Sequence, residues 1–258
     1  MLSAIRVAAI ASNTVREAVR SRVLYVLLFF AVTLMLFGIV LSSLSYVESE
    51  RILQDVAMAA MRVFGVAIAI FVGVNLIHKE VDRRTVYTIL SKPLTRAEFL
   101  FGKFAGLVLT IWLQLAIMVA CFMGVSALTG AEVGAGHAAA FVLLGGELAL
   151  IVAVATLFSS FSTPLLSSFF TAGVWLAGHL TRDLRDVGLR SNSEWVGEAG
   201  VWLHRMLPDL QSFNLTIEAV HGLPVTAADV WLPLVYGAAY TTLLLLAATL
   251  IFDRRDFR

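Results

Sequence analysis

Charged residues, cysteine and proline are all scarce in this sequence. Only 14% of its 258 residues are charged and 59% are hydrophobic, with a mean hydropathy of +0.88, whereas soluble globular domains carry about 25% charged residues. This composition excludes an ordinary soluble domain and indicates an integral membrane protein. The single cysteine, Cys121, lies in an apolar run, so the chain has no disulfide framework. A net charge of +1 gives no indication of nucleic-acid binding.

The motifs of common catalytic sites are also missing. The sequence has no G-x-x-x-x-G-K-[ST] nucleotide loop, no H-E-x-x-H pair and no G-x-S-x-G nucleophile turn. His78 has no second histidine at helical spacing, which argues against a metal site there. We therefore expect no catalytic residue, metal or cofactor in this chain, and interpret its histidines as loop or interfacial residues.

Long apolar runs predict an all-α, polytopic fold of six membrane-spanning helices, since about 20 apolar residues cross the hydrocarbon core. The predicted spans are 23–44, 56–77, 104–128, 138–158, 164–180 and 231–252. Pro164 follows a short polar break, so the fourth and fifth spans should form a helical hairpin. The spans make one transmembrane domain over residues 23–258.

Residues 1–22 are expected to form an amphipathic elbow helix. Apolar side chains such as Ala11 and Ala18 share one side at 100° per residue, while Arg16 and Arg20 lie on the other. Such a helix would lie along the inner membrane surface and turn into the first span. Because no cleavage site follows that span, we expect it to be retained rather than removed as a signal peptide.

Basic residues set the predicted orientation. Most Lys and Arg fall in segments 1–22, 78–103 and 253–258. An even number of predicted spans separates these segments, so all three lie on the same side of the membrane. The positive-inside rule puts these segments in the cytoplasm, so both termini are cytoplasmic and the expected location is the bacterial inner membrane.

The long connection 181–230 is then extracytoplasmic. Trp195, Ala199, Trp202 and Met206 recur in it at helical spacing, and tryptophan is typical of membrane interfaces. We expect either an interfacial helix in the outer leaflet or a cap helix packed on the spans. The acidic character of this segment also suggests a docking surface for a periplasmic partner.

Polar residues inside the predicted spans are Arg62, Gln114 and Glu147. A charge in lipid needs a partner or a watery cavity. Arg62 and Glu147 have similar expected depths, so they could form a structural ion pair, or face a polar path together with Gln114. Small residues at Gly65, Ala69 and Gly73, and at Gly102 and Gly106, would allow close helix packing.

Segment 78–103 is a charge-dense island between two apolar runs. Pro93 would end one helix, and Thr95 with Glu98 three residues later forms the pattern of a capping box at the start of the next. This organisation predicts a rigid helix-turn-helix. The alternative, a solvated loop whose basic residues only fix the membrane topology, explains the charges but not the proline and the capping box.

The order Lys79-Glu80-Val81-Asp82-Arg83-Arg84-Thr85, then Leu90-Ser91-Lys92-Pro93-Leu94-Thr95-Arg96, then Gly102-Lys103, resembles the permeases of type-2 ABC exporters. Among these permeases it resembles the six-span subunits that are similar to the permease of nitrous-oxide-reductase maturation. The Pro208-Asp209-Leu210 to Phe213-Asn214 stretch is also similar to that family.

The resemblance implies a permease subunit whose loop 78–103 forms a coupling helix docked into a separate ATPase. The residues expected to couple the two subunits are Lys79, Glu80, Asp82, Arg83, Arg84, Thr85, Pro93, Arg96 and Lys103. ATP and Mg²⁺ would be bound by that partner, and two permease copies would form the path between them. The alternatives are a mechanotransmitting subunit that moves no cargo and an intramembrane enzyme, for which Glu147 alone is insufficient.

Overall fold

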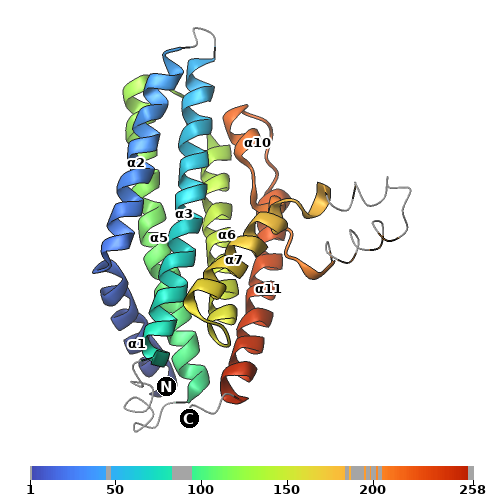
Figure 1. Ribbon diagram of the computed structural model, residues 1–258. Helices are drawn as coiled ribbons and strands as arrows, with labels where there is room; N and C mark the ends of the chain where they lie inside the picture. Colours follow the sequence, from blue (N-terminus) through green and yellow to red (C-terminus); the bar gives the residue numbers. More distant parts are fainter. Residues whose placement is uncertain are drawn as a thin grey trace.

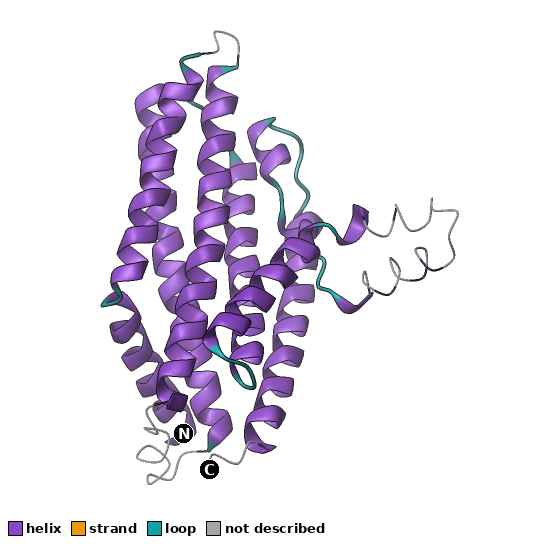
Figure 2. Cartoon of the chain, in the orientation of Figure 1, coloured by secondary structure: helices purple, strands orange, loops and turns teal. Residues whose placement is uncertain are grey.

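The chain folds into an elongated bundle of helices (Figures 1 and 2). A computed structural model describes residues 2–44, 48–82, 95–183, 186, 195, 198, 202 and 205–254. Every regular element within this described part is a helix, so the predicted all-α fold is confirmed.

The N-terminal helix is separate from the first span. Helix α1 (Leu2–Val19) ends just before α2 (Arg22–Ser42), with Arg20 and Ser21 between them. The apolar side of α1, which we expected on the bilayer surface, packs in large part on α5 (Arg96–Thr129) instead. Ala18 is fully buried there. Helix α1 is thus part of the packed bundle at one of its ends, which we call the basal end (Figure 1).

Two helices are much longer than a membrane crossing requires. Helices α3 (Ser49–Asp82) and α5 each contain 34 residues, which corresponds to about 51 Å at 1.5 Å per residue. The hydrocarbon core is only about 30 Å thick. Both helices run to the basal end beside α1 (Figure 1), so their ends extend past the apolar layer.

Helices α6 (Ala135–Ser159) and α7 (Pro164–His179) form the predicted hairpin. Helix α6 is the most enclosed of the long helices, because α3, α5, α7 and α11 (Ala227–Arg254) all pack on it. Helix α7 has 16 residues, or about 24 Å. By length and composition, five helices of the described part could span a membrane: α2, α3, α5, α6 and α11. The remaining expected span corresponds to α7.

The described elements between α7 and α11 lie toward the end of the bundle opposite the basal end, which we call the outer end (Figure 1). They include the 3₁₀ helix η1 (Gln211–Phe213) and the short helix α10 (Thr216–Val220), both packed against α6. Helix α11 then runs to the basal end, where α1 also lies (Figure 1). The described parts of the two chain ends are therefore on the same side of the bundle.

The glycines of α3 allow close packing on α6. A Cβ built on Gly65 would lie 3.1 Å from Leu148 Cδ1, and one on Gly73 would lie 3.2 Å from Ala155 Cβ. These distances leave little room for a side chain, so the small residues are used for contact within the chain.

Candidate functional sites

The expected coupling residues that the structure describes lie on the basal parts of α3 and α5. Lys79, Glu80 and Asp82 belong to the last turn of α3, and Arg96 is the first residue of α5. The other four predicted residues of the loop, Arg83, Arg84, Thr85 and Pro93, lie outside the described residues. The structure thus shows two long helices that frame the loop.

The start of α5 is fixed by the predicted capping box, which is confirmed. The Thr95 hydroxyl accepts a hydrogen bond from the Glu98 amide at 3.2 Å, and a Glu98 carboxylate oxygen accepts one from the Thr95 amide at 3.0 Å. Both bonds satisfy amide groups that the first helical turn leaves without intrahelical partners. The helix so capped is the long span itself, which connects the loop directly to the bundle.

Lys103 lies on α5 but faces the bundle rather than a partner surface. Its side chain is only 2% exposed, and Nζ lies 3.7 Å from Glu17 Oε2 of α1. A buried lysine near a carboxylate holds two helices in one register, since separating the pair would leave a charge in a poorly solvated place. The contact of Lys103 is therefore with α1.

Two glycines beside Lys103 make the contact between α1 and α5 close. A Cβ on Gly102 would lie 2.8 Å from Ile10 Cβ, and one on Gly106 would lie 2.6 Å from both Ala11 O and Thr14 Cβ. No side chain fits at such distances without displacing the backbone of α1. Helix α1 thus rests directly on the segment of α5 that leaves the loop.

A second site is a buried charge cluster in the middle of the bundle. Glu147 occupies the midpoint of α6 and is fully buried. Its Oε2 lies 3.5 Å from Arg62 Nε of α3, so the structure brings these two predicted residues together. A charge at the bilayer centre costs about 2.5–3.5 kcal/mol on insertion scales, which explains why each one lies against the other.

Helix α7 completes this cluster with two residues that the sequence analysis did not select. Trp175 Nε1 donates a hydrogen bond of 3.0 Å to Glu147 Oε1, and His179 Nε2 lies 3.5 Å from the same oxygen. His179 is therefore more than an ordinary interfacial histidine. Its i, i+4 spacing from Trp175 on a mostly apolar helix was the available signal. The carboxylate of Glu147 connects α3, α6 and α7.

Gln114 does not join the cluster. It is 4% exposed on α5, and its side-chain amide has no hydrogen-bond partner among the described residues. Trp112, two residues earlier, donates to Gly145 O of α6 at 3.0 Å. The predicted polar path that combines Gln114 with the ion pair is therefore not formed by contacts between these side chains.

The outer segment is anchored to three helices. Phe213 is fully buried, and a Cβ on Gly237 of α11 would lie 2.7 Å from its ring, while one on Gly146 of α6 would lie 3.3 Å from it. Leu210 packs in the same way on Gly178 at the end of α7. The Pro208 to Asn214 stretch noted in the sequence is thus a wedge between α6, α7 and α11.

Polar contacts strengthen this anchoring. Arg182 Nη2 lies 2.8 Å from Asp209 Oδ2. On α11, the Tyr236 hydroxyl accepts a hydrogen bond from the Asp209 amide, and the Tyr240 hydroxyl donates one to Met206 O. Of the predicted interfacial residues, Trp195, Trp202 and Met206 are helical and exposed, whereas Ala199 lies outside the described residues.

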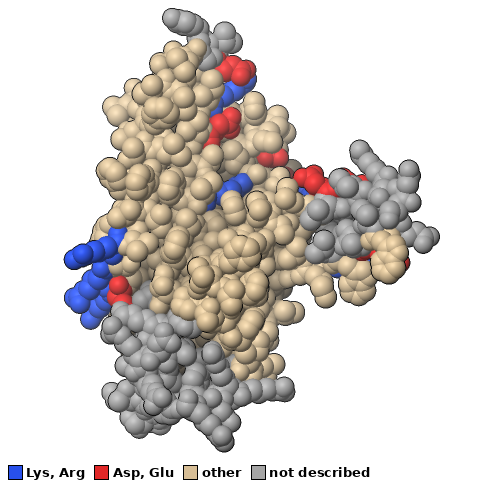
Figure 3. Space-filling view, in the orientation of Figure 1, with Lys and Arg blue, Asp and Glu red and all other residues tan. Residues whose placement is uncertain are grey.

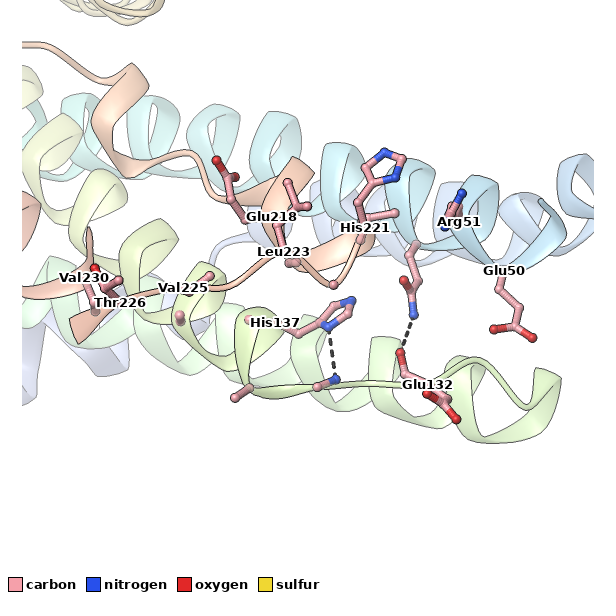
Figure 4. A pocket seen from close by; sticks show the side chains of 18 of the residues that line it. Glu50, Arg51, Glu132, His137, Glu218, His221, Leu223, Val225, Thr226 and Val230 are labelled. Carbon is pink, nitrogen blue, oxygen red and sulfur yellow. Dashed lines mark hydrogen bonds between the residues drawn. The ribbon is translucent and has the colours of Figure 1, made fainter. Parts of the chain in front are cut away.

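A cavity of about 640 Å³ opens at the outer end, between the start of α3, the 132–139 segment and α10 (Figure 4). His137 lies at its wall and is 3% exposed. Its Nδ1 accepts a hydrogen bond from the Gly134 amide at 3.3 Å, so in the neutral ring the hydrogen is on Nε2. That nitrogen is buried and has no hydrogen-bond partner among the described residues.

The cavity mouth carries Glu50, Glu132 and Glu218 (Figure 4). Across the described part of the chain, however, no group of three or more His, Cys, Asp and Glu side chains has a geometry suited to a metal ion.

Comparison with protein families gives one result. The family model described as ABC-2 family transporter protein matches residues 8–181, which is more than half of the chain and runs from within α1 to the end of α7. A comparison with curated proteins gives no match.

Proposed function

Because this chain belongs to the ABC-2 family of transporter proteins and is a permease subunit of an ABC transporter, we propose that a separate ATPase drives it through segment 78–103. The ATPase would bind ATP and Mg²⁺, and this chain would carry out no catalysis of its own. The similarity of the loop and the wedge to the permease of nitrous-oxide-reductase maturation suggests that subgroup of exporters.

The observation that carries the proposal is the length and continuity of α3 and α5. Both extend about 20 Å beyond what a crossing needs, and both end at loop 83–94. A force applied to the loop would reach the bundle through two unbroken helices. The capping box at Thr95 supports this function, because it keeps the first turn of α5 hydrogen-bonded up to the loop.

The contact of Lys103 with Glu17 extends the same path to α1. Since Gly102 and Gly106 leave no space between α1 and α5, a displacement of α5 would carry α1 with it. We therefore assign Lys103 to transmission within the permease, while the charged residues 79–84 and Arg96 would meet the ATPase.

The proposed topology has six crossings, with α7 as a short fifth one. An even number is supported by the position of α1 and the end of α11 at the same end of the bundle (Figure 1). By the positive-inside rule, the arginines of α1 and the basic segment 78–103 favour a cytoplasmic position for this end. The membrane would be the inner membrane of a bacterium. Helix α11 keeps most of its surface exposed, and a second copy of the chain would pack there to form the path.

A second function, mechanotransmission to a periplasmic partner, is favoured by the wedge. Phe213 and the Arg182–Asp209 pair connect the outer segment firmly to α6, α7 and α11, so helix movements would reach the outer surface. Reconstituted vesicles distinguish the two functions, since a transporter moves cargo without the partner and a mechanotransmitter does not.

The coupling proposal is tested by charge reversal in the complex of permease and ATPase. We expect Glu80→Lys, Asp82→Lys and Arg83→Glu each to reduce ATPase retention on the purified permease, and its permease-stimulated ATP hydrolysis, by about tenfold or more, because buried interfacial charges that lose their partners cost several kcal/mol.

The matched control is Glu132→Lys, which makes the same charge change on an exposed residue at the opposite end of the bundle. It should leave ATPase retention unchanged. If all three charge-reversal variants reach the membrane in wild-type amounts and still bind the ATPase and stimulate it normally, coupling through segment 78–103 is refuted.

A further inference from the structure

A cavity at the basal end lies between α1, the start of α2 and α3. Its volume is about 800 Å³, and it is lined by Asn13, Arg16, Glu17, Arg20, Ser21, Val23, Phe71, Val72 and Asn75. It is distinct from the buried charge cluster, and among its described lining residues only Glu17 takes part in the transmission path proposed above.

The α1 wall of this cavity is polar and cationic. Asn13, Arg16, Glu17 and Arg20 follow one another at i, i+3, i+4 and i+7, so they form one stripe along the helix. The opposite side of α1, with Ala11 and Ala18, is the one packed in the bundle. The stripe is thereby held facing the cavity.

The described lining of the cavity carries a net positive charge. Glu17 is the only acidic residue among those that the structure describes there, and Lys103 lies 3.7 Å from its carboxylate on the α5 side. The charge of Glu17 is thus balanced from within the bundle, which leaves the guanidinium groups of Arg16 and Arg20 to attract an anion. Space-filling atoms of Lys and Arg gather on this flank, over α1 and the start of α2 (Figure 3).

On α2 and α3 the lining is mainly apolar, with Val23, Phe71 and Val72 beside Asn75, and it continues onto the surface that faces lipid. Val23 and Phe71 are 46% and 45% exposed, and α2 continues upward with exposed Val26, Phe30 and Phe37. A ligand for this site therefore needs an anionic head for the arginines and a hydrocarbon tail for α2. A free inorganic anion would contact the arginines but leave the apolar side chains of α2 and α3 uncovered.

We propose that the cavity binds the phosphodiester headgroup of an anionic membrane phospholipid, with its acyl chains along α2. Arg16 and Arg20 pair with the phosphate, and the Asn13 amide is placed to donate to its oxygens. Arginine suits this ligand because its planar guanidinium binds two phosphate oxygens at once. Basic pockets between transmembrane helices on the cytoplasmic side are known to bind anionic headgroups.

The test measures lipid binding by native mass spectrometry of the full-length protein released from nanodiscs that contain equal amounts of phosphatidylglycerol and phosphatidylcholine. The wild type should retain phosphatidylglycerol selectively. With roughly a fivefold contribution from each arginine, the R16Q/R20Q variant should bind it about 30-fold more weakly.

Two further variants separate a site from diffuse attraction. R6Q/R22Q removes the same charge from α1 and α2 outside the cavity lining and should keep phosphatidylglycerol. Asn75→Phe leaves all charges in place but puts a ring into the cavity from its rim, and should lose the bound lipid. Equal loss in R6Q/R22Q and R16Q/R20Q, or no selectivity in the wild type, overturns the proposal.

A third arm distinguishes the source of the phosphate. Inorganic phosphate at millimolar concentration should neither displace phosphatidylglycerol nor raise the Tm of the detergent-purified protein. Displacement by inorganic phosphate would show a free-anion site and refute the lipid assignment. These readouts need no ATPase, so they are independent of whether the coupling proposal holds.

Discussion

At the scale of single residues, the Glu147 carboxylate of α6 connects three helices, because it lies against Arg62 of α3 and accepts a hydrogen bond from Trp175 of α7. Two opposite charges at similar depth in separate apolar runs have few alternatives to meeting each other. The participation of Trp175 and His179 could not be derived in the same way, because the rotation of α7 about its axis is set by packing against α3 and α6 and not by a periodic pattern in sixteen mostly apolar residues.

This cluster yields a prediction on stability. Glu147→Ala should lower the free energy of unfolding by about 3–5 kcal/mol, since it leaves Arg62 buried without its partner. Arg62→Ala should cost less, because the Glu147 carboxylate keeps the hydrogen bond from Trp175. In the double variant the losses should not add, with a coupling energy of about 0.5–3 kcal/mol. Denaturant unfolding in detergent micelles gives the free energy of unfolding of the wild type, the two single variants and the double variant.

Gln114 provides the control for this cycle. It is equally buried on a neighbouring helix but lacks a hydrogen-bond partner among the described residues, so Gln114→Leu should be neutral or stabilising. Strict additivity of the Arg62 and Glu147 losses would show that the 3.5 Å approach contributes no stability.

At the scale of elements, local motifs were predictable and docking faces were not. The Thr95–Glu98 capping box depends on four consecutive residues and formed as expected. Lys103 was expected to meet the ATPase, and the structure places it against α1. The sequence did contain the relevant signal, because Gly102, Lys103 and Gly106 share one side of α5, and two glycines on a helix side indicate a close neighbour.

Close contact between α1 and α5 predicts opposite effects for two identical substitutions in α5. Gly106→Ala puts a methyl group 2.6 Å from Ala11 O and should destabilise the protein by about 1–3 kcal/mol. Gly124→Ala meets no atom within 4 Å and should be neutral or stabilise the helix by about 0.5–1 kcal/mol. Thermal unfolding compares the two variants.

Hydrogen exchange locates the effect of Gly106→Ala. Amides of α1 should exchange faster in this variant, whereas those of α6 and α11 should be unaffected. If both alanine variants unfold alike, then α1 does not rest on α5 in the way described, and its proposed movement with α5 would lose its basis.

At the scale of the whole molecule, the apolar runs predicted the helical membrane domain and its order, but not the lengths of its helices. The hydropathy of α3 falls at His78, yet the helix continues to Asp82, because an amphipathic or charged sequence can stay helical once it leaves the lipid. Helix α7 is short for the opposite reason. Pro164 fixes its start, and the chain turns at Leu180 so that Leu210 can pack on Gly178.

Whether sixteen residues cross the membrane determines the orientation of everything after them. A helix of about 24 Å can span if the bilayer thins locally or flanking residues reach the interface, at a cost of fractions of a kcal/mol per Å. The Arg62–Glu147 cluster gives α7 a buried polar partner, which favours its insertion beside α6. With α7 as a crossing, Ser162 is cytoplasmic and Leu223 is outside; without it, both are cytoplasmic.

Cysteine labelling distinguishes these arrangements, since Cys121 is the single native cysteine. In a Cys121→Ser background, Leu223→Cys, at a 48% exposed position, should react with a membrane-impermeant maleimide in spheroplasts. Ser162→Cys, in the turn between α6 and α7, should react only after the membrane is permeabilised. Protection of both positions until permeabilisation would contradict a crossing by α7, and with it the placement of Leu223 on the outer side beside Glu50 and His137.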